Sequence, residues 1–110
     1  MGIRMYCYYY IKTDCLTNTW DTAKIRQFLN TLGIFTEKYA GHFSRQSPFI
    51  TLSLMKVKDI NSWSGEDYDE KETNYIAIVT GESEEGASVR EGLFRKLELF
   101  LGFRVCADDS

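Results

Sequence analysis

The sequence predicts an α+β fold: a single domain over residues 1–110 with an antiparallel or mixed sheet, two helices packed on one sheet face, and the order β-α-β-β-β-α-β. Three observations support this fold class. A chain of 110 residues has the length of one ordinary domain. Its 44% hydrophobic and 26% charged residues are close to the globular average. Segments in which apolar residues alternate with period two are interrupted by two segments with apolar residues at helical spacing.

Residues 3–12, IRMYCYYYIK, predict the first strand because aromatic and β-branched side chains dominate this stretch. Alternation places three side chains together on one strand face: Tyr6, Tyr8 and Tyr10. We expect these tyrosines to pack in the core or to cover the sheet, because aromatic side chains readily fill strand faces. A stacking platform for RNA is disfavoured, because the basic and glycine positions of an RNP-type sequence are missing.

Two helices are predicted. The first is expected over residues 19–32, with Asn18 as the N-cap, Asp21 complementing the positive helix end, and Gly33 as the C-terminal stop. The second is expected over residues 84–101, where the apolar residues recur at helical spacing: Val89, Leu93, Leu97 and Phe100.

The remaining segments predict strands. Residues 35–58 alternate with period two, and we expect two strands there, joined near residues 45–48. Residues 74–80, NYIAIVT, are apolar on both faces and are therefore expected to form a central strand. Residues 103–107 predict a short last strand. Residues 59–75 then link two strands.

No catalytic signature is present, and we expect no enzymatic activity, no cofactor and no bound metal. His42 is the only histidine in the sequence, and metal sites need several ligands, so we expect it to be a surface or hydrogen-bonded structural residue. Cys7, Cys15 and Cys106 lack CxxC spacing. We expect all three cysteines to be reduced and to behave as small buried hydrophobes.

The carboxylates of residues 67–72 are of the type that binds calcium or magnesium. Their spacing is wrong for an EF-hand. A loop beginning at Asp67 would need an oxygen ligand where Lys71 stands and glycine where Glu72 stands. We therefore expect no functional cation site.

The N-terminal sequence MGIRMYCYYYIKTDC differs from a signal peptide because tyrosines interrupt its apolar run. The chain also lacks a run of about 18 consecutive apolar residues, the length that a membrane span needs. We expect a cytoplasmic protein without a membrane partner.

Charge is distributed unevenly along the chain. Residues 1–58 carry eight Lys and Arg against three Asp and Glu, a net of +5, whereas residues 59–85 carry one against nine, a net of −8. Residues 86–110 balance at four of each sign. Nucleic-acid binding relies on Lys and Arg to neutralise phosphates, so we expect no direct binding of DNA or RNA. An acidic surface suits a protein partner with a basic surface.

Much of this acidic charge lies in DINSWSGEDYDEKETNY, residues 59–75, called here the acidic segment. It also contains aromatic residues, which are enriched at the energetic centres of protein interfaces. We therefore expect it to bind a protein partner through seven residues: Trp63, Glu66, Asp67, Tyr68, Asp69, Glu70 and Glu72. The alternative is a solvated loop that only discourages aggregation.

A compact domain with this α/β order and the loop DINSWSGEDYDEKE resembles the small bacterial immunity proteins of contact-dependent growth inhibition and related polymorphic toxin systems. The resemblance implies a non-enzymatic inhibitor that binds and neutralises one cognate toxin, often a nuclease, by covering its active site or occupying its substrate groove. These proteins share no sequence motif, so the resemblance assigns no residue a role.

Other functions are compatible with the same features. A phage-encoded inhibitor of a host nuclease would present the same acidic segment. A small enzyme or ligand-binding domain of unknown substrate, and a subunit that oligomerises through its sheet, are the further alternatives.

Overall fold

A sheet of six strands is the central layer of the computed structural model, which describes residues 6–15, 17–46, 48–57, 68–81 and 84–108, the side chains of 84–86 excepted. Every neighbouring pair in the order β3-β4-β5-β7-β1-β8 is antiparallel. The strands of this sheet are β1 (Tyr6–Lys12), β3 (Thr36–Tyr39), β4 (His42–Gln46), β5 (Phe49–Met55), β7 (Tyr75–Gly81) and β8 (Cys106–Ala107).

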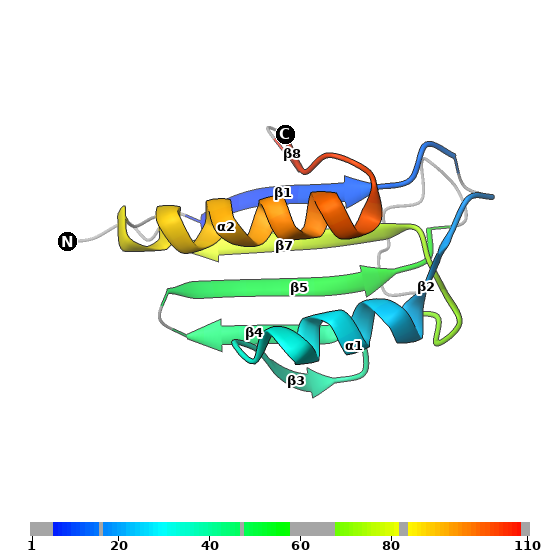
Figure 1. The fold of residues 1–110 in the computed structure, drawn as a ribbon, viewed down its shortest axis with the longest axis horizontal. Helices are drawn as coiled ribbons and strands as arrows, with labels where there is room; N and C mark the ends of the chain where they lie inside the picture. The colour runs from blue at the N-terminus through cyan, green and yellow to red at the C-terminus, as the bar shows by residue number, and fades with distance from the viewer. Residues whose placement is uncertain (1–5, 16, 47, 58–67, 82–83, 109–110) are drawn as a thin grey trace.

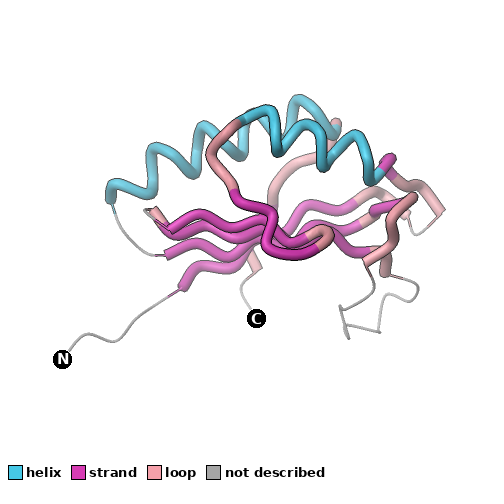
Figure 2. The backbone as a smooth tube through the Cα atoms, turned by 90° about the horizontal axis from the view of Figure 1, so that it is seen from below, coloured by secondary structure: helices cyan, strands magenta, loops and turns pink. Residues whose placement is uncertain are grey.

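Two helices cover one face of this sheet, and the opposite face has no helix over it in the described part of the chain (Figures 1 and 2). α1 spans Thr22–Leu32 and α2 spans Glu84–Leu101. The predicted α+β class is therefore confirmed, and α2 has the predicted bounds. Neither of the helices among the described residues has the length and apolar character needed to cross a membrane.

The hydrophobic core lies between the helices and the sheet. Alternation along each strand turns every second side chain toward the helices, so that directly opposed partners such as Leu52 and Ile78 both point into the core. The core side chains are all at most 7% exposed: Ile11, Phe43, Ile50, Leu52, Leu54, Ile76 and Ile78 from the sheet, and Ile25, Leu29, Leu93, Leu97 and Leu101 from the helices.

α1 begins later than predicted. Its N-cap is Asp21, whose carboxylate accepts a hydrogen bond from the backbone N–H of Ala23, whereas Asn18 donates to the Asp14 side chain. The predicted Asn18 cap is wrong because Trp20–Asp21 forms a short strand, β2, which pairs with β6 at Glu72–Thr73. Extended pairing and helical backbone exclude one another, so the helix starts after this strand.

The region predicted to hold two strands, residues 35–58, contains three: β3, β4 and β5. The predicted connection near residues 45–48 matches the end of β4 and the start of β5. The additional turn lies between β3 and β4, where Gly41 has a φ of 80°, a left-handed conformation that suits glycine. The sequence gives a weak signal there, because residues 36–46 contain no Pro, Asn or Asp.

The prediction of a central strand at residues 74–80 is confirmed, since β7 lies between β5 and β1. The last strand is shorter than predicted. Only Cys106–Ala107 pair with β1, because the backbone N–H of Val105 donates to Glu98 of α2 instead. Phe103 packs edge-on against the ring of Trp20, with 5.8 Å between ring centroids.

Candidate functional site

The acidic segment is described from Tyr68 onward. Of the seven predicted partner-binding residues, Trp63, Glu66 and Asp67 lie outside the described residues. The described part leads into β6 and β7 at the end of the sheet where β5 finishes, since Met55 pairs with Tyr75. Four predicted binding residues occupy this part: Tyr68, Asp69, Glu70 and Glu72.

Tyr68 fastens the acidic segment to the fold. Its half-buried ring packs against the core and lies so close to Gly41 that a Cβ added there would overlap the ring. Its hydroxyl accepts a 3.4 Å hydrogen bond from Nη1 of Arg26 on α1. Much of the Tyr68 side chain therefore serves the fold and is not available to a partner.

Arg26 also holds the β3–β4 turn through Glu37. Its Nε and Nη2 donate to the two carboxylate oxygens of Glu37 at 2.8 and 3.1 Å, and the backbone N–H of Gly41 donates to the same carboxylate at 3.1 Å. Partial burial opposes ionisation of Glu37, but the hydrogen bonds from Arg26 and Gly41 outweigh it, and the pKa of this carboxyl lies below its ordinary value. Arg26 thus links α1, the turn and Tyr68.

Asp69 shapes the backbone of the acidic segment. Its Oδ1 accepts hydrogen bonds from the backbone N–H groups of Lys71 and Glu72, both at 2.8 Å. These two bonds to the ionised form lower the pKa of Asp69. Its carbonyl oxygen accepts a 2.9 Å hydrogen bond from the Thr22 hydroxyl at the start of α1.

Glu72 is engaged on two sides. Its carboxylate accepts a 2.6 Å hydrogen bond from Nζ of Lys56, which follows β5, and a 3.0 Å bond from the hydroxyl of Thr19. The contact with Lys56 is the main reason that the pKa of Glu72 is lowered. The side chains of Glu70 and Glu72 are both exposed.

Five contacts therefore tie the described end of the acidic segment to the rest of the fold: Tyr68 with Gly41 and Arg26, Asp69 with Thr22, and Glu72 with Lys56 and Thr19. The sequence predicted partner contacts for all seven residues, through their charges and aromatic rings. The structure separates Tyr68, Asp69 and Glu72, whose contacts hold the segment in place, from Glu70. This division was not visible in the sequence, because the contacts of Tyr68, of Glu72 and of the Asp69 carbonyl are made to distant parts of the chain.

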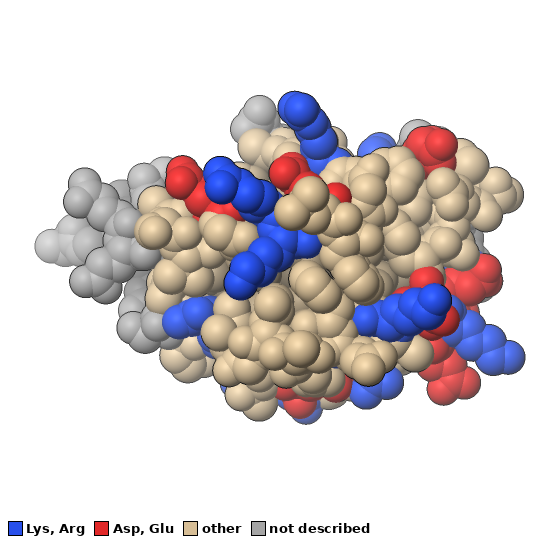
Figure 3. Space-filling view, in the orientation of Figure 1, with Lys and Arg blue, Asp and Glu red and all other residues tan. Residues whose placement is uncertain are grey.

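Charge on the helix-covered side is of both signs, with Lys and Arg interspersed among Asp and Glu over α1 and α2 (Figure 3). Exposed Arg95 and Lys96 of α2 lie near exposed Glu91 in the sequence. Mixed charges largely cancel within a Debye length of about 8–10 Å. A strong field of one sign on the chain is therefore expected from the acidic segment rather than from the helices.

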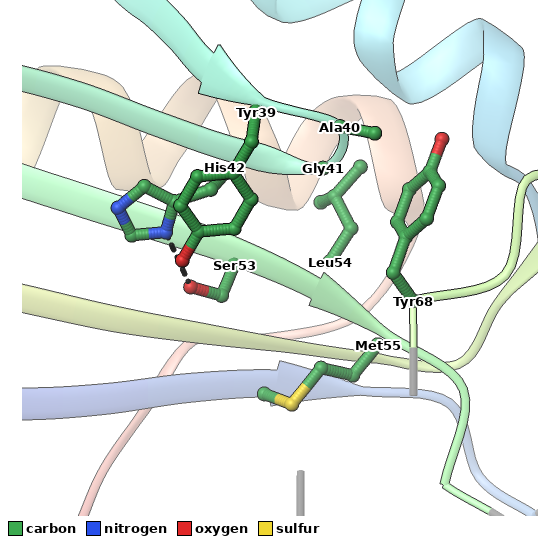
Figure 4. A pocket seen from close by; sticks show the side chains of 8 residues that line it. All are labelled: Tyr39, Ala40, Gly41, His42, Ser53, Leu54, Met55 and Tyr68. Atoms are coloured by element: carbon green, nitrogen blue, oxygen red, sulfur yellow. Dashed lines mark hydrogen bonds between the residues drawn. The ribbon is translucent and has the colours of Figure 1, made fainter. Parts of the chain in front are cut away.

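A cavity of about 200 Å³ lies beside the acidic segment, with Tyr68 on one side and the stacked rings of Tyr39 and His42 on the other (Figure 4). The Tyr39 and His42 ring centroids are 4.7 Å apart, with 6° between the ring planes. Nδ1 of His42 is 3.0 Å from the hydroxyl of Ser53, so the expected hydrogen-bonded structural histidine is found. Small-molecule sites usually measure about 300–1,000 Å³, so this cavity suits a single side chain better than a cofactor.

The described residues include three cysteines, one histidine and several carboxylates. Among them, no group of three or more His, Cys, Asp or Glu side chains is placed to hold a metal ion. Cys7, Cys15 and Cys106 are free thiols. The expectation that they are small buried hydrophobes is wrong for Cys15 and Cys106, which are exposed, because both lie in segments at the margin of the sheet.

The sheet face opposite the helices is called here the tyrosine face. It comprises the side chains of β1, β4, β5 and β7 that alternate away from the core, among them Tyr6, Tyr8 and Tyr10. Packing in the core is not observed for Tyr6 and Tyr8, which are 39% and 53% exposed. The rings of Tyr6 and Tyr10 instead cover part of this sheet face, in contact with Phe49 and Tyr75. The sequence predicts two helices, which are enough to cover one face of the sheet. This number already indicated that the other face lies outside the core.

Comparison of the chain with protein-family models, with curated proteins and with solved structures finds no match.

Proposed function

We propose that this protein is a non-enzymatic inhibitor of the immunity type, which binds and neutralises a cognate toxin with a basic surface through the acidic segment. The observation that carries the proposal is that Tyr68, Asp69 and Glu72 hold the described end of this highly charged segment in place. Contacts that order a charged loop do not improve solubility. They do favour binding, because a preorganised segment loses less conformational entropy on association.

The proposal assigns different roles to the charged and the aromatic residues of the segment. Its carboxylates produce a field that attracts a basic partner and speeds association. Lasting affinity comes from a few desolvated anchors, and Trp63 is the aromatic residue of the segment that we assign to this role. Tyr68 contributes through the cavity that it shares with Tyr39 and His42, which offers space for one side chain of the toxin.

The test measures binding kinetics against the purified protein encoded by a toxin gene directly upstream of the gene for this chain. Glu70→Gln together with Asp67→Asn is expected to slow association several-fold and to flatten its salt dependence. Trp63→Ala is expected mainly to speed dissociation. The matched control is Glu91→Gln, which removes one carboxylate from the exposed side of α2 and should leave both rates unchanged.

Protection of cells from the same toxin provides the second readout. Variants that slow association or speed dissociation should protect less than the parent chain. If the acidic and aromatic variants bind and protect as well as the parent does, the acidic segment is not the inhibitory surface.

A further inference from the structure

The central strands of the tyrosine face carry little charge. Among the described positions of β1, β4, β5 and β7 that alternate onto this face, Lys12 is the one residue that is formally charged. At the β8 edge, Asp108 donates its backbone N–H to the Tyr8 carbonyl and lies near Tyr75. The helix side carries many charges of both signs (Figure 3). Depletion of charged residues together with enrichment of tyrosine is typical of the central part of protein interfaces.

The tyrosine face also has a definite relief, which follows from the sizes of its side chains. On β1 the large residues Tyr6, Tyr8 and Tyr10 form a ridge along the strand. Two aromatic pairs lie at the ends of the ridge. Tyr6 packs edge-on against Phe49, with 5.6 Å between ring centroids, and Tyr10 stacks on Tyr75, with 5.7 Å between ring centroids. Between these pairs, the neighbouring strands carry only moderate or small side chains.

The strand register places Tyr8 in the same row as Val79 and Thr51. The adjacent row contains Ala77 and Ser53. We call Thr51, Ser53 and Ala77 the low patch, because these short side chains rise less from the sheet than the aromatic rings at both of its ends. Tyr8, 53% exposed, therefore projects beside a low patch of about its own size.

A projection beside a depression is self-complementary under two-fold symmetry. When two such sheets face each other with the axis parallel to the strands, the projection of each copy meets the depression of the other. We infer that this protein forms a homodimer through its tyrosine face, in which Tyr8 of each copy packs on the low patch of the other. An axis across the strands would instead set ridge against ridge.

The size of the face fits a dimer of moderate affinity. β1, β5 and β7 have seven residues each. Four strands at about 4.8 Å spacing and about 3.3 Å rise per residue give a footprint of roughly 19 by 23 Å. Projecting side chains increase the accessible area above this flat value, toward the roughly 800 Å² per partner of a standard interface. We expect a dissociation constant in the micromolar range.

Net charge gives the dimer a characteristic response to salt. With the axis parallel to the strands, both copies have the same end of the sheet side by side, and that end carries acidic and basic side chains alike: Asp69, Glu70, Glu72, Lys12, Lys56 and Lys71. Each copy has a formal net charge of −3, so the two copies repel one another, and salt screens the repulsion. The dimer should therefore become tighter as salt rises, whereas binding of the acidic segment to a basic toxin should become weaker.

Sedimentation equilibrium of the full chain without any partner tests the inference. The mass should rise from monomer to dimer between about 1 μM and about 1 mM protein, the range that a micromolar constant implies. Dimerisation should be stronger in about 1 M than in about 0.1 M NaCl, because the Debye length falls from about 10 to about 3 Å. A chain that stays monomeric throughout, or a dimer that salt weakens, overturns the inference.

Two substitutions and one control locate the interface. Tyr8→Glu and Thr51→Lys should each weaken dimerisation at least tenfold, since each buries an unpaired charge. Leu99→Glu adds the same charge as Tyr8→Glu at an 82% exposed site on α2 and should have no effect. Circular dichroism confirms that each variant is folded. If Leu99→Glu disrupts the dimer and Tyr8→Glu does not, the interface is on the helices.

Mixing the two variants tests the predicted contact directly. In a mixed dimer, the new glutamate at position 8 meets the new lysine at position 51 across one contact, while the other contact keeps the parent residues. The mixture should form heterodimers more readily than either variant forms homodimers. Failure of the mixture to associate more strongly overturns the pairing of Tyr8 with the low patch. None of these measurements requires a toxin, so their failure leaves the proposed inhibitor function standing.

Discussion

Two glycines with the same backbone conformation differ in what surrounds them, and the difference tests the position of Tyr68. Gly33 and Gly41 have φ values of 70° and 80°. A Cβ at Gly33 would meet nothing within 4 Å, whereas a Cβ at Gly41 would overlap the Tyr68 ring. Gly33 is therefore a matched control for Gly41.

Gly41→Ala is expected to lower the free energy of unfolding more than Gly33→Ala does. Both variants place a side chain in left-handed backbone, which costs about 1–2 kcal/mol. Gly41→Ala must also displace the Tyr68 ring, which adds about 1–3 kcal/mol. Urea unfolding of both variants measures the difference. Equal losses would mean that the Tyr68 ring does not lie on Gly41.

The contact between Glu37 and Arg26 predicts a dependence of stability on pH. The folded-state pKa of Glu37 is lowered, so its contribution is present above the unfolded pKa of about 4.3 and is lost as pH falls through the folded pKa. Glu37→Gln should cost about 1 kcal/mol at neutral pH, a value reduced by the partial exposure of Arg26.

Unfolding of the parent and of Glu37→Gln across pH provides the measurement. Their difference in unfolding free energy should be constant above about pH 5 and should shrink below about pH 4. Glu91→Gln on α2 serves as the control. A difference between parent and Glu37→Gln that grows on acidification would contradict the lowered pKa.

At the scale of elements, the start of α1 distinguishes the observed cap from the one that the sequence predicted. The Asp21 carboxylate accepts a hydrogen bond from the backbone N–H of Ala23, in the first turn of α1. The Asn18 side chain instead donates a hydrogen bond to Asp14. Asp21→Ala should therefore cost about 1 kcal/mol of stability. Asn18→Ala should cost less than about 0.5 kcal/mol, as surface substitutions usually do. Thermal unfolding compares the two, and a larger loss for Asn18→Ala would restore the predicted cap.

Elements whose signal is local were predictable from the sequence. α2 has its predicted bounds because Val89, Leu93 and Leu97 recur at helical spacing, and β7 is central because it is apolar on both faces. Short pairings made over long sequence distances were not predictable. β2 forms because Trp20 and Asp21 pair with Thr73 and Glu72. No pattern in the local sequence predicts such a pairing.

The candidate site shows the same limit. The charge of the acidic segment was visible in the sequence, but its fastening was not, because Tyr68 is held by Arg26 and Gly41 and Asp69 by Thr22. The position of the tyrosine face was left open between core and sheet surface for a related reason. Period-two alternation shows that Tyr6, Tyr8 and Tyr10 share one face, but it does not say which face the helices cover.

At the scale of the whole molecule, one continuous core joins both helices to the sheet, and this predicts a single cooperative unfolding transition. Leu29 of α1 and Leu93 of α2 are 0% and 3% exposed within the same cluster of core side chains. Leu29→Ala and Leu93→Ala should each cost about 2–5 kcal/mol through lost transfer energy and a cavity. Leu99→Ala, at an 82% exposed position of α2, should change stability by less than about 0.5 kcal/mol.

The decisive measurement is whether different probes report the same transition. Far-ultraviolet circular dichroism follows helices and strands, and near-ultraviolet circular dichroism follows aromatic packing. In urea, the two midpoints should coincide for the parent and should move together in both core variants, because loosening either helix exposes the same core. A variant at Leu29 that shifted one probe while leaving the other unchanged would mean that α1 unfolds separately. The sheet and α2 would then form an independent unit, and the acidic segment, fastened to α1 by Thr22 and Arg26, would lose its support before the sheet unfolds.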